Sequence, residues 1–267
     1  MQRTQAIPRP RKMKKTFKLV ISAGHYLGNP KGCLKSLDPN ETREWVLNDR
    51  VADKLEKILA DYDGIEILRV DDTTGKKNVT LKERTDAANE WEGDFYVSIH
   101  FNAGVSKIVR TEVGIDEDGE PVVEDVVVAG KGGGIVVYVY TNPQAASVEW
   151  QKALYDSMLR HGGLKGNRAT PLARADLHEV RETRMAACLC ELGFMDSSTD
   201  VPVILTEEYA DNMAKAIAEV VIEKSGAKKK ARTLYRVQVG AFGKKENAEA
   251  MLKKLEAAGF DGYITTL

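Results

Sequence analysis

Apolar residues recur along this chain with two alternating periods. Short apolar runs, typical of buried strands, alternate with longer segments whose apolar residues recur every three or four positions, as on one face of a helix. The runs that predict strands are 17–22, 65–70, 95–99, 135–140 and 186–192, and the segments that predict helices are 38–58, 80–91, 143–159 and 206–223. Strands that alternate with helices predict an α/β fold, in which a twisted, mostly parallel sheet is flanked by helices.

Residues 105–134 interrupt this alternation. The sequence Asp116-Glu-Asp-Gly119 resembles a hairpin turn between two alternating runs, and a flexible run of three glycines ends at Gly134. We expect an insertion that borders a cleft.

Residues 225–267 have a pattern of their own. The basic segment 225–233 predicts a solvated linker. Beyond it, 235–242 alternates like a strand, 247–258 is helical with Gly259 as its cap, and 263–267 is again typical of a strand. The domains expected are thus a leader at 1–15, a main domain at 16–224, the linker, and a small βαβ unit at 234–267. That unit is too short to bury a core alone.

Composition excludes several classes of protein. The 267 residues carry a formal net charge of −1, which gives no overall attraction to nucleic acid or an anionic membrane. No apolar run is long enough to span a bilayer. The basic N-terminus lacks the apolar region of a signal peptide, so we expect synthesis in the cytoplasm without one. Three cysteines, two of them in the apolar run 186–192, argue against a disulfide framework.

Titratable residues stand at the ends of several predicted elements. His25 and His100 each follow an apolar strand, and Glu191 ends another. Glu44 continues the inward stripe of the 38–58 helix, with Glu41 as an alternative. Because a buried carboxylate must be paired or ligated, and because ligands bind beyond the strand ends of α/β sheets, these side chains are candidates for one site. Two His and one Glu are a ligand set of zinc hydrolases, which leave one position for water, and a further carboxylate can accept the proton of that water.

The same residues carry a resemblance to a known family. The motifs AGHYLGNPKG, Glu44 with Asn48, SIHFNA and CELGFMDS resemble the zinc-dependent N-acetylmuramoyl-L-alanine amidases of phage endolysins and bacterial autolysins. The resemblance implies Zn²⁺ bound by His25, Glu44 and His100, with Glu191 as the catalytic base. It also matches a family Arg and Asn at Arg84 and Asn89. The usual histidine-glycine-glycine start is replaced by His25-Tyr26-Leu27, and the insertion is long.

The activity implied is hydrolysis of the amide between N-acetylmuramic acid and L-alanine in peptidoglycan. Asn102, Arg84 and Arg168 are candidates for substrate binding. Two alternatives stay open: a zinc peptidase that cuts the stem peptide, because the same metal chemistry serves either bond, and a non-catalytic wall-binding protein with structural zinc.

The C-terminal YRVQVGAF segment with its amphipathic helix resembles one half of the sporulation-related repeat (SPOR) module, which binds peptidoglycan glycan strands. That module normally has two halves. We therefore hypothesise a homodimer in which two chains pair their halves, and we expect the protein to act on the bacterial cell wall after release.

Overall fold

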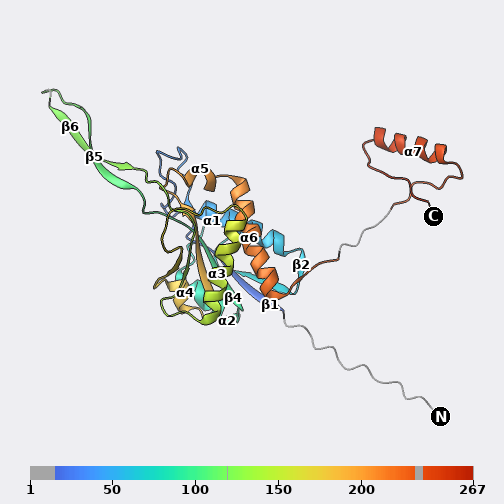
Figure 1. Ribbon diagram of the computed structural model, residues 1–267, viewed down its shortest axis with the longest axis horizontal. Coiled ribbons are helices and arrows are strands. Elements are labelled where there is room, and N and C mark those ends of the chain that lie inside the picture. The colour runs from blue at the N-terminus through green and yellow to red at the C-terminus, as the bar shows by residue number, and fades with distance from the viewer. Residues whose placement is uncertain (1–15, 119, 232–236, 267) are drawn as a thin grey trace, which may run out of the picture. The chain divides into compact units, whose positions relative to one another are not determined.

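The computed structural model describes residues 16–118, 120–231 and 237–266, so the expected leader at 1–15 lies outside the described residues. A six-stranded sheet in the order β3-β1-β4-β9-β7-β8 forms the centre of the main unit (Figure 1). Its strands are β1 (Phe17–Ala23), β3 (Ile65–Arg69), β4 (Phe95–Asn102), β7 (Val136–Val139), β8 (Leu172–Arg174) and β9 (Ala186–Phe194). All neighbours pair in parallel except β7 and β9, which are antiparallel. The predicted mostly parallel sheet is confirmed.

Helices cover both faces of this sheet, as expected for strands that are apolar on both sides. One face packs against α1 (Glu44–Leu59), α3 (Ala145–Arg160) and α6 (Glu207–Ser225), and the other against α2 (Leu81–Glu90) and the short α4 (His178–Glu182). Successive strand residues alternate between the two cores: Leu19 and Ile21 face the first, and Val20 faces the second. The free and buried Cys188 and Cys190 share the first face, as residues two apart on one strand do.

Two helix starts show how local polar groups set the boundaries. A capping box of Thr80 and Glu83 is present at the start of α2, which agrees with the helix expected from residue 80. By contrast, α1 begins at Glu44, six residues after residue 38, where the helical segment was expected to start. The Asp38 carboxylate instead accepts hydrogen bonds from the backbone N–H groups of Asn40 and Thr42, which closes a turn before the helix.

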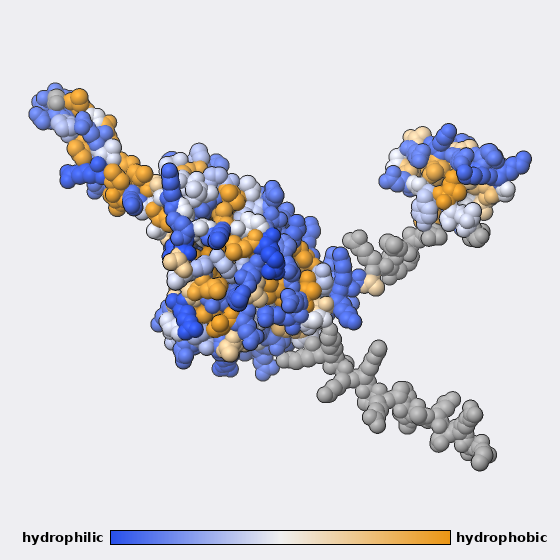
Figure 2. Space-filling model, viewed as in Figure 1, coloured by the Kyte–Doolittle hydropathy of each residue, from blue (hydrophilic) through white to orange (hydrophobic). Residues whose placement is uncertain are grey.

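The insertion forms an antiparallel hairpin of β5 (Lys107–Ile115) and β6 (Pro121–Val128), which confirms the predicted turn. Every described side chain of these two strands is exposed. Figure 1 shows the hairpin extending from the main unit, and Figure 2 shows orange, apolar residues along it. Its base is anchored by the Asp196 carboxylate, which accepts from three successive backbone N–H groups at 104–106.

The chain divides into two compact units after Lys230. Part of the expected linker is ordered, because β10 (Lys228–Lys229) pairs with β2 (Tyr62–Asp63). In the second unit the predicted helix is present as α7 (Lys245–Ala257), followed by Gly259 at a φ of +83°. The two flanking strands are absent from the described residues 237–242 and 263–266, so the βαβ prediction is wrong there. A strand needs a hydrogen-bonded neighbour, and the described residues of this short unit supply none.

The remaining helix, α5 (Val201–Ile204), is a single turn that leads from β9 towards α6. No helix among the described residues has both the length and the apolar character needed to cross a bilayer.

Candidate active site

The register of the sheet brings two of the predicted site residues together. In the parallel pair β4–β9, His100 lies directly opposite Glu191, so both side chains leave the same face. The two strands extend three and two residues further than expected, to Asn102 and Phe194. His25 follows β1 on the other side of β4, after Gly24. Gly24 packs against the His100 ring so closely that an added Cβ would lie 2.1 Å from its Cε1 atom. Glycine at position 24 therefore makes room for the imidazole.

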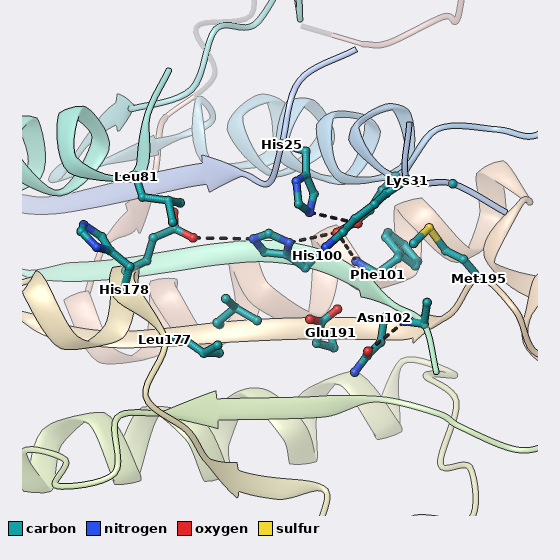
Figure 3. Close-up of a pocket in the computed structure, with 15 residues that line it drawn as sticks. His25, Lys31, Leu81, His100, Phe101, Asn102, Leu177, His178, Glu191 and Met195 are labelled. Carbon is teal, nitrogen blue, oxygen red and sulfur yellow. Dashed lines mark hydrogen bonds and ion pairs between the residues drawn. The ribbon is translucent and has the colours of Figure 1, made fainter. Parts of the chain in front are cut away.

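Glu44 joins the two imidazoles. Its position as the first residue of α1, on the buried stripe that also holds Leu47 and Val51, turns the carboxylate inward, where it is only 3% exposed. One carboxylate oxygen lies 3.0 Å from Nε2 of His25 and the other 2.9 Å from Nδ1 of His100 (Figure 3). One ligand atom from each of these three residues lies within 4.8 Å of the others. Glu41 lies outside this cluster and is half exposed near Lys35.

The charges of the site favour a bound cation. Burial raises the pKa of Glu44, but hydrogen bonds and the charges of His100 and His25 outweigh it and hold the pKa well below the usual range. For His100, burial lowers the pKa, while the carboxylates of Glu179 and Glu44 raise it to about 10. The carboxylates thus draw positive charge to this point. A divalent metal ion can supply that charge, and two imidazoles with one carboxylate are suitable ligands for zinc.

Glu191 differs from the other carboxyl groups. Burial, the largest influence, and the charge of Glu44 raise its pKa to about 7, against the lowering effect of His100 and Lys31. Its Oε2 atom is buried without a hydrogen-bond partner among the described residues. A carboxyl group with a pKa near neutrality and a free oxygen beside the metal-ligand cluster is suited to accept a proton there.

These residues line a pocket of about 480 Å³. Asn102 and Lys31 also line it, and Figure 3 shows both beside the cluster. The exposed Arg168 is not among the lining residues, and its guanidinium stacks over the ring of Phe194 at 5.1 Å.

Arg84 lies beneath the site instead of in its opening. The side chain is 2% exposed, and the guanidinium donates to the backbone carbonyls of Ala23, at 2.5 Å, and His25, at 2.7 Å. It therefore holds the turn that carries His25. Its place in the structure is that of a positioning residue.

The sequence analysis missed Glu179, a buried carboxylate of α4 that lines the same pocket. A signal was available, because Ser22 and Ser98 interrupt two apolar strands at paired positions, and both donate to this carboxylate. Polar residues at buried strand positions indicate a partner from elsewhere in the chain.

A parallel-sheet edge that gathers two imidazoles and a carboxylate beside a carboxyl group of raised pKa is an arrangement typical of metal-dependent hydrolases. The model of the N-acetylmuramoyl-L-alanine amidase family matches residues 19–223, and the chain belongs to this family. It is therefore a hydrolase of peptidoglycan. The model of the SPOR domain matches residues 205–266, a range that begins just before α6 of the main unit.

Individual proteins similar to this chain are also N-acetylmuramoyl-L-alanine amidases. The chain is 28% identical to the sporulation-specific N-acetylmuramoyl-L-alanine amidase of Bacillus subtilis, over 92% of this chain and 84% of that protein. It is also 28% identical to the N-acetylmuramoyl-L-alanine amidase CwlM of Bacillus licheniformis, over 78% of this chain and 70% of that protein. The catalytic domain of CwlV from Bacillus (Paenibacillus) polymyxa has the same fold, with a TM-score of 0.61 at 21% identity over 79% of this chain and 99% of that domain.

Proposed function

We propose that this chain hydrolyses the amide between the lactyl group of N-acetylmuramic acid and the first L-alanine of the stem peptide, with Zn²⁺ held by His25, Glu44 and His100. The observation that carries this proposal is the convergence of these three side chains beside Glu191, whose Oε2 atom is buried. Bound there, Zn²⁺ would polarise the scissile carbonyl and increase the acidity of a water molecule in its open position.

Glu191 is the general base in this proposal. It accepts a proton from the attacking water as the water oxygen bonds to the carbonyl carbon, and it returns the proton to the alanine nitrogen as the C–N bond breaks. Its raised pKa supports both transfers, because the carboxylate holds a proton near neutral pH and can also release it.

Asn102 is the proposed substrate contact inside the pocket, since its side chain borders the space next to Glu191. Arg84 acts behind the site, through the loop that carries His25. Arg168 can contact only the parts of the polymer that extend beyond the pocket.

We further propose that the second unit completes itself by pairing with the same unit of another chain. No residue of α7 is buried, and Phe260 and Tyr263 are 64% and 70% exposed. A unit of 37 residues whose helix buries no side chain and whose aromatic residues are exposed has an apolar surface that a second copy can cover.

Digestion of purified cell walls tests the activity. We expect mass spectrometry to find muramic acid with free lactyl carboxyl groups and peptides that begin with L-alanine, and we expect a chelator to stop the reaction until zinc is restored. Glu191→Gln should keep its zinc and lose activity by about 10²–10⁴-fold, the range of general-base catalysis. His100→Ala should lose the metal as well.

Other products would show that the proposed activity is wrong and would identify an alternative. Cleavage within the stem peptide would identify a zinc peptidase, and an absence of products from a zinc-loaded chain would identify a wall-binding protein with structural zinc. If Glu191→Gln kept near wild-type turnover, the base would have to be another residue.

A further inference from the structure

Glu179 is a carboxylate that the mechanism above does not use. Its side chain is 3% exposed, and three neutral hydroxyl groups donate to it. Ser22 Oγ and Tyr96 OH each lie 2.6 Å from Oε1, and Ser98 Oγ lies 2.8 Å from Oε2. The hydroxyls come from β1 and β4, so the carboxylate is fixed against the two strands that lead to the predicted zinc ligands.

The His100 imidazole lies between this carboxylate and Glu44. Its Nδ1 atom is 2.9 Å from Glu44, within the metal-ligand cluster, and its Nε2 atom is 3.6 Å from Oε2 of Glu179. Figure 3 shows the ring with a dashed contact on each side. Nε2 is buried and has no hydrogen-bond partner at closer range among the described residues. A small movement of the ring would bring it into hydrogen-bond distance of Glu179.

A histidine that binds a metal through one ring nitrogen carries its proton on the other. If Nδ1 faces the metal, the N–H of His100 is at Nε2, where burial makes an acceptor necessary. Glu179 is the carboxylate on that side. Arg84 donates to the Ser22 hydroxyl at 2.8 Å, and that hydroxyl in turn donates to Glu179. The Nε2 atom of His100 faces the other carboxylate oxygen of Glu179 at 3.6 Å and can donate its proton to it.

The helix that carries Glu179 is itself held in place. Asn89 of α2 donates to the backbone carbonyl of Glu182 and accepts from the backbone N–H of Arg184, on either side of the end of α4. The Thr183 hydroxyl donates back to the carbonyl of Glu179. A five-residue helix needs such contacts to present one side chain in a defined position.

We propose that Glu179 is a positioning residue for the zinc ligand His100: it accepts the proton-bearing Nε2 and thereby directs the lone pair of Nδ1 at the metal. This inference rests on the proposed zinc site. It assigns the serine, tyrosine and arginine side chains around Glu179 to one buried network that orients a ligand, which Ser22 and Arg84 connect to the turn holding His25.

Zinc affinity, measured by competition with a chromophoric chelator, tests the proposal. Glu179→Gln and Glu179→Ala should bind zinc roughly 10–100-fold more weakly than the wild type, the usual effect of removing an outer partner of a ligating histidine. Glu182→Gln is the matched control, because it changes an exposed carboxylate of the same helix and should leave zinc affinity unchanged. Cobalt-substituted Glu179→Gln should also show an altered visible spectrum, which reports ligand geometry directly.

A measurement on the wild type remains decisive even if a variant does not fold. ¹⁵N spectra of the zinc-loaded chain with labelled histidine should show His100 protonated at Nε2 and metal-bound at Nδ1, and the reverse assignment overturns the proposal. Equal zinc affinity and equal cobalt spectra in wild type and Glu179→Gln overturn it too, while leaving the proposed function intact. A wild-type chain that binds no zinc overturns both.

Discussion

Glu191 illustrates how a single residue acquires its chemistry from its surroundings. As the end of an apolar strand it is an ordinary carboxyl group, with a reference pKa of 4.5. Its burial beside Glu44 raises that pKa to about 7 in the metal-free protein. The sequence predicted the position of this group at a strand end, but the neighbours that change its pKa come from β4, α1 and the loop that carries Lys31.

Metal-free Glu191→Gln should therefore be more stable than the metal-free wild type above pH 7. A carboxyl group whose pKa is raised on folding favours the folded state while it is protonated, and this contribution is lost as the pH rises from about 4.5 through 7. Glutamine is neutral throughout, so the difference should grow from near zero at pH 4.5 to on the order of 3 kcal/mol at pH 8. Urea unfolding in the presence of a chelator measures it. Glu182→Gln, an exposed change, should show no such trend, and a difference that did not vary with pH would contradict the raised pKa.

At the scale of helices and strands, the sequence predicted an element correctly where a short local motif, such as a cap or a turn, sets its boundary. The capping box fixes the start of α2, and β5 and β6 pair as an antiparallel hairpin, as expected for a turn between them. Two expectations differ from the structure. The start of α1 moved because Asp38 bonds to a turn, and the strands around α7 did not form because a strand depends on a neighbour that sequence alone does not supply.

The β5–β6 hairpin and its base should respond differently to mutation. Replacing residues 107–128 by a short Gly-Ser turn should leave the midpoint of thermal unfolding and the zinc affinity nearly unchanged, because no described side chain of the two strands is buried. Asp196→Ala should destabilise the chain by about 1.5–3 kcal/mol, since this carboxylate holds three backbone N–H groups at the hairpin base. Differential scanning calorimetry compares the two. A large loss of stability on removing the hairpin would show that its apolar residues are covered in solution.

For the whole molecule, the two units differ in how completely each buries its own apolar side chains. The first has a continuous core on both faces of its sheet, whereas the second leaves Val237 and Val239 84% and 56% exposed. The match of the SPOR model to residues 205–266 supports a wall-binding role for the second unit.

Pairing of the second units predicts a dimer in solution. Light scattering should give a mass of about 59 kDa, twice the 29.5 kDa of one chain, at micromolar concentration. A chain that ends at Lys230 should be a monomer. Val239→Asp should also shift the full chain towards the monomer, because it places a charge in the proposed apolar contact. A strict monomer at all concentrations for the unaltered chain would rule out the pairing.

The sequence by itself determined the alternation of strands and helices, the inward stripe that ends at Glu44, and the histidines and glutamate at strand ends, because periodicity and turn chemistry are local. Only the tertiary structure decided that His100 lies opposite Glu191, that Arg84 is buried under His25, and that Glu179 reaches the same imidazole. These relations depend on strand register and on helices packed across the sheet, which join residues far apart in the chain, and burial then determines which charges each group must balance.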